Sequence, residues 1–243
     1  VKEAKPPRAA GLSGRGPCGR RPSLPLSPGA PPCYRGQGNP MPGKPDYYWR
    51  KSKDQGYPAR SVWKLQEMQE RFRLLDAGPR VLDLGCSPGS WSLMVLDVLG
   101  GRGVLTGVDL DEPDAKLLRR PGFTFIRGDF TDPAVLAAIA ARGPFDVVLS
   151  DAAPSTSGNR IRDTERSLEL GRAVIAAAAT CLRPGGNLAL KIFQGGGERE
   201  LLDSLRAGFE TARAFKPKAS RSESMEVYHV GLRRRGVSAT LES

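Results

Sequence analysis

The sequence predicts an α/β fold: a mostly parallel, seven-stranded sheet with helices on both faces and an antiparallel C-terminal strand. Three observations predict it. Short apolar runs alternate with helical patterns from residue 56 onward, a glycine-rich turn follows the first apolar run, and two strand patterns follow each other directly near the end. Alternating strands and helices are typical of a parallel sheet wound on both faces. Two consecutive strands joined by a loop indicate antiparallel pairing.

The first half of the domain opens with a helical pattern over residues 56–75, in which mostly apolar residues follow a spacing of three and four. Pro58 suits the first turn of this helix because its missing N–H needs no partner there. The next elements are strands and one helix that follows the glycine turn. We expect strands over 80–85, 103–110 and 123–130, and a helix over 89–100.

The second half of the domain is delimited by clear helix signals. Asp132 with Pro133 forms a typical helix start, and Pro184 with Gly185 forms a typical helix end. These signals predict helices over 132–143 and 164–186. The other segments are strands and one further helix: strands over 145–151, 187–193, 210–217 and 225–233, and a helix over 197–209.

Residues 1–40 differ from the rest of the chain, because Pro, Gly, Ser and Arg dominate and Glu3 is the only acid. Such a segment buries too little apolar surface to offset its ordering entropy. We expect a disordered basic tail over 1–40, the α/β domain over 41–235 and a flexible tail over 236–243, with Met41 as a candidate start. The chain has no apolar run long enough to span a membrane, and residues 1–40 lack the apolar core of a secretory signal.

The net charge of the chain is +11 at pH 7, and its isoelectric point is near 9.9. This balance favours a polyanionic partner, most simply nucleic acid, although acidic small substrates would also be attracted. The four cysteines form no C-x-x-C pair, and His229 is the only histidine. We therefore expect no metal site, no disulfide framework and a reducing, intracellular setting.

The glycine-rich turn lies in the segment VLDLGCSPGSWS, where Gly85 and Gly89 allow a ligand to approach the backbone closely. Asp109 ends the next strand, where α/β ligand sites place a carboxylate for ribose hydroxyls. Asp129 follows the third strand and could accept a hydrogen bond from an exocyclic amine, and Trp91 could offer an aromatic face to a cation. Carboxylates without a phosphate cradle fit a cationic nucleoside such as S-adenosylmethionine.

Two other interpretations of this turn stay open. A dinucleotide-dependent dehydrogenase is disfavoured because the pattern is not G-x-G-x-x-G and because Asp83 would sit poorly beside a pyrophosphate. The plainer alternative is a tight turn of a generic α/β fold, with Asp83 as a capping residue and Trp91 in the core.

Four charged residues occupy positions that folding alone would not favour: Lys64, Asp151, Lys191 and Glu226. Lys191 is the hardest to explain, because it interrupts the apolar strand pattern NLALKIF. Asp151 and Lys191 end consecutive strands, so their side chains should meet at the carboxyl edge of the sheet. Taken singly, Lys64 is also compatible with a solvated helix charge, Glu226 with an edge-strand charge and Asp151 with a turn cap.

Five motifs in one order carry a resemblance to a known family: ARSVWKL, DLGCSPGSWS, SDAAPSTSGN, LALKIFQG and SRSESMEVYHV. With them, residues 46–232 resemble the FtsJ/RrmJ family of RNA ribose 2′-O-methyltransferases. The resemblance implies a Rossmann-like, S-adenosylmethionine-dependent methyltransferase fold and a catalytic tetrad of Lys64, Asp151, Lys191 and Glu226. It places cofactor contacts on Gly89, Trp91, Asp109, Asp129 and Asp151. The small residues Cys86, Ser87 and Ser90 depart from the family pattern without an evident effect on binding.

The resemblance further implies methylation of a uridine ribose in large-subunit ribosomal RNA, within the assembled subunit. Nothing in the sequence demands more than a monomer, and without a long apolar run we expect no membrane contact. Lys191 would either take the proton of the 2′-hydroxyl or stabilise the oxygen as a fixed cation. The basic residues expected to bind RNA phosphates are Arg50, Lys51, Lys53, Arg60, Lys216, Lys218 and Arg221. Taken singly, each is equally compatible with a plain solubilising charge. Transfer RNA, another RNA, and a non-catalytic role in ribosome assembly remain alternatives. We expect a cytoplasmic protein, or a mitochondrial one if residues 1–40 are a transit peptide.

Overall fold

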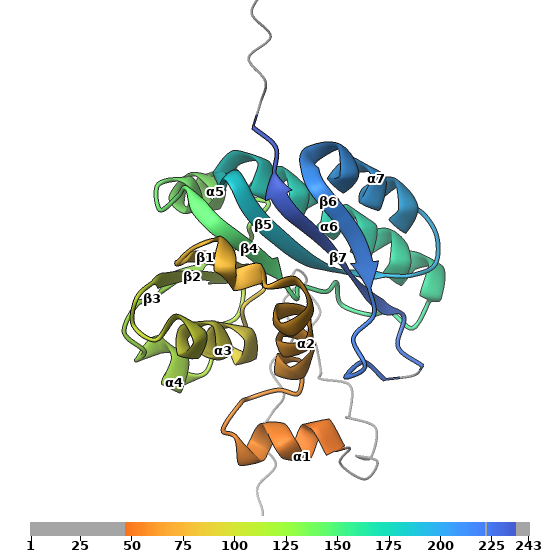
Figure 1. Ribbon diagram of the computed structural model, residues 1–243. Coiled ribbons are helices and arrows are strands. Elements are labelled where there is room, and N and C mark those ends of the chain that lie inside the picture. Colours follow the sequence, from red (N-terminus) through yellow and green to blue (C-terminus); the bar gives the residue numbers. More distant parts are fainter. Residues whose placement is uncertain (1–46, 222, 237–243) are drawn as a thin grey trace, which may run out of the picture. The chain divides into compact units, whose positions relative to one another are not determined.

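The computed structural model describes residues 47–221 and 223–236. The tail expected over 1–40 lies outside these residues, as do residues 237–243. Within the described residues, seven strands form one sheet in the order β3-β2-β1-β4-β5-β7-β6 (Figure 1). The strands are β1 (Arg80–Leu84), β2 (Val104–Asp109), β3 (Phe123–Arg127), β4 (Phe145–Ser150), β5 (Leu182–Phe193), β6 (Phe209–Phe215) and β7 (Glu226–Arg234). Only β7 runs antiparallel to its neighbours, β5 and β6, which confirms the predicted sheet.

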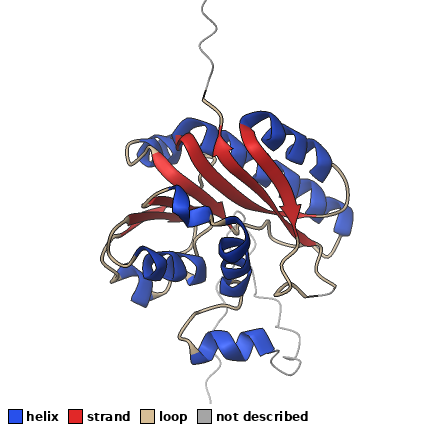
Figure 2. Cartoon of the chain, in the orientation of Figure 1, coloured by secondary structure: helices blue, strands red, loops and turns tan. Residues whose placement is uncertain are grey.

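Helices cover both faces of this sheet (Figure 2). They are α1 (Tyr47–Asp54), α2 (Val62–Phe72), the short 3₁₀ helix η1 (Leu74–Ala77), α3 (Ser90–Leu99), α4 (Ala115–Leu118), α5 (Pro133–Ala140), α6 (Arg160–Cys181) and α7 (Glu198–Gly208). Within the described part of the chain, none of them is long and apolar enough to span a lipid bilayer.

Two apolar cores lie on opposite faces of the sheet, because side chains alternate along each strand. Along β1, Val81 belongs to the core that includes residues of α2, α3 and α4, whereas Leu82 belongs to the core that includes residues of α5, α6 and α7. The same alternation places Ala189 and Tyr228 in the core of the α2 face. Lys191 is two residues beyond Ala189 on β5, and Glu226 is two residues before Tyr228 on β7. Both therefore belong to the face that α2 covers.

Three helix boundaries differ from the sequence prediction by four residues or more. The long helix begins at Arg160, because the Asn159 side chain accepts hydrogen bonds from the backbone N–H groups of residues 161 and 162. It ends at Cys181 and not at Gly186, because Leu182 already pairs with Phe145 in the sheet. Helix α2 begins at Val62 and not at residue 56, where the sequence predicted the start of this helix. Helices α1 and α4 were not predicted, since both are short and have no apolar period.

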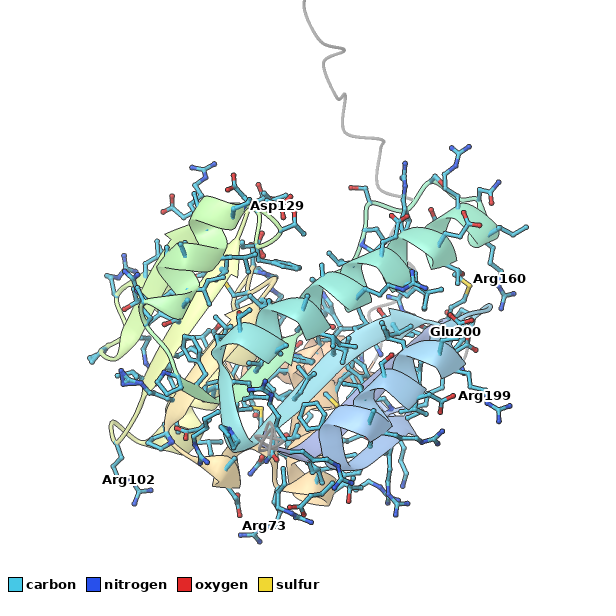
Figure 3. All side chains as sticks on the ribbon, turned by 90° about the horizontal axis from the view of Figure 1, so that it is seen from above. Arg73, Arg102, Asp129, Arg160, Arg199 and Glu200 are labelled. Atoms are coloured by element: carbon cyan, nitrogen blue, oxygen red, sulfur yellow. The ribbon has the colours of Figure 1, made fainter. Side chains whose placement is uncertain are left out.

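The carboxyl ends of the parallel strands meet at one edge of the sheet. Figure 3 shows Asp129, just after β3, at the opposite end of the molecule from Arg73 and Arg102, which precede β1 and β2. Gly85 follows β1 at this edge with a φ of 79°, and an added Cβ there would lie 2.8 Å from the Ala152 Cα. Only glycine fits this turn, so the turn brings the strand end close to the segment that follows β4.

Candidate active site

The ends of β1 to β4 and one side of α6 border a cavity of about 640 Å³, which we call the acidic cavity. Its charged lining residues are Asp109, Asp129, Asp151, Glu169 and Arg166. Its apolar walls include Leu110, Phe130, Ala152, Pro154, Leu170 and Ala173. A mostly apolar cleft with a few converging carboxylates suits a flat ligand that carries positive charge or hydroxyl donors.

Two predicted carboxylates are held rigidly in this cavity by backbone hydrogen bonds. Asp109 accepts from the Ser87 backbone N–H at 2.8 Å with Oδ2, and from the Asp111 backbone N–H at 3.0 Å with Oδ1. Asp129 accepts from the backbone N–H and the hydroxyl of Thr131, at 2.8 and 2.7 Å, through Oδ1. Because a carboxylate oxygen can accept more than one hydrogen bond, both groups keep acceptor capacity for a ligand.

Gly89 and Trp91 lie beside this site but do not line the acidic cavity. Gly89 precedes α3 with a φ of 113°, and an added Cβ would lie 2.8 Å from the Leu117 Cδ2. Trp91 is buried, donates its indole N–H to the Ser61 carbonyl at 2.9 Å, and packs its ring 5.7 Å from that of Tyr228. Both residues therefore stabilise the turn and the start of α3. Their predicted cofactor contacts stay predictions.

Asp151 compensates the charge of Lys191, as the sequence predicted. Its Nζ lies 3.1 Å from the Asp151 Oδ1 and donates to the Asp151 backbone carbonyl at 2.5 Å. The Lys191 side chain is 8% exposed and that of Asp151 is 18% exposed. An ammonium group has three donors, and these contacts occupy two of them. The third can face a substrate oxygen.

Lys64 and Glu226 form the second ion pair of the site, with Nζ and Oε2 2.5 Å apart. They lie 162 residues apart in the sequence, and α2 and β7 bring them together. Burial works to raise the pKa of Glu226, but the charge and hydrogen bond of Lys64, together with the charge of Lys191, leave that pKa below its ordinary value. Glu226 is therefore a stable carboxylate at neutral pH, and all four predicted charges share one site.

Tyr228 joins the two ion pairs, and the sequence analysis missed it. Its hydroxyl donates to the Asp151 Oδ1 at 2.7 Å, and its ring centre lies 5.9 Å from the Lys64 Nζ. Burial and the charge of Asp151 raise the pKa of Tyr228 well above its ordinary value, so the phenol keeps its proton. The available signal was the period of two in MEVYHV, which places Glu226 and Tyr228 on one face of a strand.

A second cavity, of about 440 Å³, is lined in part by Lys64 and Glu226, and we call it the basic cavity. Its lining residues are Ala59, Arg60, Ser61, Lys64, Arg221, Glu223, Ser224 and Glu226. Asp151 lines the acidic cavity, whereas Lys64 and Glu226 line the basic one. Tyr228 contacts residues of both cavities. The four predicted catalytic charges thus stand between two cavities of different electrostatic character.

The family model described as FtsJ-like methyltransferase matches residues 57–234, which include both cavities and both ion pairs. The chain belongs to the FtsJ-like methyltransferase family. This membership confirms the resemblance that the five motifs indicated. It also agrees with the seven-stranded sheet and its antiparallel β7.

Curated relatives of this FtsJ-like methyltransferase are named for ribosomal RNA. Ribosomal RNA large subunit methyltransferase E of Nitratidesulfovibrio vulgaris (strain Miyazaki F) is 47% identical over 193 residues, which cover 79% of this chain and 95% of the relative. The protein of the same name from Treponema denticola is 44% identical over 189 residues, covering 78% of this chain and 94% of the relative. The likeness therefore extends over nearly the whole of both relatives.

Solved structures show the same fold. A structure described as a ribosomal RNA methyltransferase from Plasmodium falciparum has a TM-score of 0.64 and 27% identity, and the match covers 74% of this chain and all of the other. Human methyltransferase-like protein 13, crystallised with S-adenosylhomocysteine, has a TM-score of 0.50 and 16% identity over 75% of this chain and 83% of its own. The second match supports only the fold, which is that of Rossmann-like methyltransferases.

A further buried acid lies on β1 of this FtsJ-like methyltransferase. Asp83 on β1 is fully buried, and its Oδ2 accepts from the Ser92 hydroxyl at 2.6 Å. Burial raises the pKa of Asp83 to about 7. The hydrogen bond from Ser92 lowers this pKa, whereas the negative charges of Asp151 and Asp109 raise it further. Asp83 therefore links β1 to α3, and it does not cap the turn as one interpretation of the sequence had it.

The basic residues expected to bind RNA fall into three groups. Arg60 and Arg221 line the basic cavity, whereas Lys51, Lys216 and Lys218 line a separate hollow beside Tyr48 and Trp63. Arg50 and Lys53 are exposed on α1, where the Lys53 Nζ also donates to the Pro58 carbonyl at 3.0 Å. The structure thus brings seven predicted residues to α1, to the start of α2 and to the loop between β6 and β7.

Proposed function

We propose that this protein transfers the methyl group of S-adenosylmethionine to a ribose 2′-hydroxyl of RNA, at a uridine of large-subunit ribosomal RNA in the assembled subunit. One observation carries the proposal: Lys64, Asp151, Lys191 and Glu226 form two ion pairs between an acidic and a basic cavity. A positively charged methyl donor fits the first cavity and a polyanion fits the second. Family membership and the names of the relatives support the same reaction.

The residues of the acidic cavity fit S-adenosylmethionine, which supplies a methyl group bound to positively charged sulfur. Asp109 would accept hydrogen bonds from the ribose hydroxyls, and Asp129 from the amine of the adenine. The glycine at position 85 keeps the floor of the cavity open, since a Cβ there would collide with Ala152. Asp151 would add negative charge beside the donor. The carboxylates of the cavity thus complement a cationic nucleoside.

Lys191 is the residue that we assign to the attacking 2′-hydroxyl. Two of its donors are used by Asp151, so the remaining one can point at the hydroxyl oxygen and stabilise the negative charge that develops there. This arrangement favours a fixed cation over a general base. The hydroxyl proton would then pass to solvent water as the O–C bond forms and the S–C bond breaks, which leaves S-adenosylhomocysteine. Asp151 and Tyr228 hold the Lys191 ammonium in place, while Lys64 and Glu226 position the ribose.

The substrate would be held by the seven basic residues through phosphates, without reading the base sequence. The compact domain adds no further RNA-binding module within residues 47–221 and 223–236, so selectivity would come from the shape of a preformed ribosomal particle. We further propose that the protein acts as a monomer. Its bacterial relatives support a cytoplasmic location.

Mass spectrometry of ribose methylation tests this function. Large ribosomal subunits from cells that lack the protein are incubated with purified protein and S-adenosylmethionine, with free ribosomal RNA and transfer RNA in parallel reactions. We expect one new 2′-O-methyluridine in the large-subunit RNA of intact subunits and none with Lys191→Ala. Methylation of transfer RNA alone would reassign the substrate. Binding to subunits without methylation of any RNA would favour the assembly role.

A further inference from the structure

We propose that Asp163 and Ser167 on α6 are positioning residues for methyl transfer, because each holds the chain beside one member of the Asp151–Lys191 ion pair. This inference rests on the proposed function and deepens it. Asp163 holds the wall of the acidic cavity that follows Asp151, and Ser167 holds the end of β5 that carries Lys191. Neither Asp163 nor Ser167 lines the acidic or the basic cavity, so both act through other residues.

The first argument is the segment between Asp151 and α6, which Asp163 holds. Residues 151–159 are all described and belong to no helix or strand, so their backbone groups need partners from elsewhere. Asp163 is buried, and its carboxylate accepts from the backbone N–H and the hydroxyl of Ser157, both at 2.8 Å, and from the Gly158 backbone N–H at 3.2 Å. These hydrogen bonds, above all the one from the Ser157 backbone, lower the pKa of Asp163, which is therefore a carboxylate at neutral pH.

The start of α6 does not itself need this carboxylate. The Asn159 side chain already caps the helix by accepting from two backbone N–H groups of the first turn. Asp163 instead closes the loop that follows β4, in which residues 152–155 form one wall of the acidic cavity. The other end of this wall packs on the glycine turn, where an added Cβ on Gly85 would lie 2.7 Å from the Ala152 Cβ. Because both ends are held, the wall keeps its shape before the cofactor binds.

The second argument is the end of β5, which Ser167 holds. Strand β5 pairs with β4 only as far as Leu190, whereas it pairs with β7 as far as Phe193. Lys191 therefore begins the part of β5 that has a strand on one side only. The buried Ser167 hydroxyl accepts from the Phe193 backbone N–H at 3.0 Å, so α6 supplies a partner where β4 has ended.

The third argument is the spacing along α6. Asp163, Ser167 and Gly171 follow each other at intervals of four residues, so they lie on one face of the helix. An added Cβ on Gly171 would collide with the Ile192 side chain, so this glycine lets α6 approach β5 beside Lys191. Alanine or leucine would suit a helix interior better than aspartate, serine or glycine. The composition of this face is therefore explained by what it holds, which is the two strand ends that carry the ion pair.

The test compares cofactor binding with methyl transfer. Calorimetry measures the Kd of S-adenosylmethionine, and single-turnover reactions on unmethylated large ribosomal subunits at saturating cofactor measure the rate of transfer. We expect Asp163→Ala to raise the Kd about tenfold and to lower the rate about tenfold, because the loop both forms the cavity wall and follows Asp151. We expect Ser167→Ala to lower the rate about tenfold and to leave the Kd within about twofold of wild type, because Lys191 does not line the acidic cavity.

Two exposed residues of α6 provide matched controls. Glu165→Ala is the control for Asp163→Ala, and both its Kd and its rate should match wild type. Thr180→Ala is the corresponding control for Ser167→Ala. Asp163→Asn keeps one carbonyl oxygen as an acceptor and should recover part of the loss. Ser157→Ala removes only one of the three hydrogen bonds on an exposed loop, so it should fold normally and raise the Kd about threefold even if Asp163→Ala does not fold.

A double variant separates positioning from general damage to the fold. In the background of Lys191→Ala, Ser167→Ala should cause almost no further loss of rate, because it acts through Lys191. A rate for Ser167→Ala equal to that of Thr180→Ala, or a full further loss in the double variant, would overturn the assignment of Ser167. An unchanged cofactor Kd in both Asp163→Ala and Ser157→Ala would overturn the assignment of Asp163.

Failure of the proposed function would look different from failure of this inference. In the first case wild-type protein would bind S-adenosylmethionine but methylate no RNA, whereas in the second case wild-type transfer would be intact. Thermal unfolding of each variant completes the test. If Asp163→Ala and Ser167→Ala lose cofactor affinity and rate alike, in proportion to their loss in Tm, then α6 has a purely structural role and the proposal is wrong.

Discussion

The acidic and the basic cavity differ in how the chain assembles them. Asp109 and Asp129 in the acidic cavity are held by backbone groups two residues later in the chain, and Asp109 also by the neighbouring turn. The basic cavity instead depends on contacts between α2 and the β6–β7 region, which lie more than 150 residues apart in the chain. The carboxylates of the first cavity are thus held largely by contacts close in the chain. The second exists only after the whole sheet has formed.

The cavities also differ in charge, and the catalytic residues stand where the two meet. Asp151 belongs to the acidic side and Lys64 to the basic side, while Lys191 and Tyr228 touch Asp151. The methyl donor is a cation and the RNA is a polyanion, so they require sites of opposite charge. The fold provides these sites as two cavities, and Tyr228 contacts residues of both. We therefore expect each substitution to affect mainly one property: cofactor binding, RNA binding or the rate of methyl transfer.

The largest effect is expected for Lys191→Ala, which should affect the reaction alone. We expect methyl transfer to fall by about 10²–10⁴-fold, because the variant loses the cation that faces the hydroxyl. Cofactor affinity should stay nearly normal, since Lys191 does not line the acidic cavity. Single-turnover kinetics and calorimetry measure the two quantities, with the exposed Lys116→Ala as the control. Activity within tenfold of wild type would refute the assignment of Lys191.

The next largest effect is expected for Asp109→Ala, which should affect the acidic side only. We expect the affinity for S-adenosylmethionine to fall by about 10- to 100-fold, because a charged hydrogen-bond acceptor for the ribose is lost. Calorimetry measures the affinity, and affinity for ribosomal subunits should not change. Asp111→Ala is the matched control, as Asp111 follows the same strand but does not line the cavity. If both variants bind the cofactor like wild type, the ribose lies elsewhere.

The contrast between the cavities also explains what could be predicted from the sequence. Strands and helices alternate with clear periods, so the sheet and the positions of Asp109, Asp151 and Lys191 at strand ends followed from pattern alone. Lys64 and Glu226 each resembled ordinary surface charges. Only the family resemblance joined them, because no local signal connects α2 with β7.

The remaining residues could not be predicted for physical reasons. Tyr228 reads as an ordinary strand residue until its register partner on β5, Lys191, is known. Glu67 reads as a solvated helix charge until the loop that it binds is folded onto α2. Trp91 is the converse case, because the sequence predicted a cofactor contact for its ring. In the structure its indole N–H donates to the Ser61 carbonyl, and its ring packs against that of Tyr228 in the core.

A smaller effect is expected for Tyr228→Phe, which removes the link between the two ion pairs but keeps the ring. We expect kcat to fall about tenfold, because Asp151 loses one donor and holds Lys191 less firmly. The KM values for cofactor and for subunits should change little. In the background of Lys191→Ala the substitution should have almost no further effect, since it acts through Lys191. Additive losses in the double variant would place Tyr228 outside this unit.

The smallest effect concerns Asp83, the buried acid on β1. Its pKa is raised to about 7 in the folded protein, so its protonated form is favoured there and its contribution to stability is lost as the pH rises through 7. His229 opposes this trend, because burial lowers its pKa to about 4 and stability is lost as the pH falls below the ordinary histidine value. Comparison with Asp83→Asn removes the histidine contribution, which both proteins share. Between pH 6 and 8, wild type should lose about 1 kcal/mol of unfolding free energy relative to Asp83→Asn in urea titrations. Parallel curves for the two proteins would show that Asp83 stays ionised, and the negative charge of the acidic side would then extend into the core of the sheet.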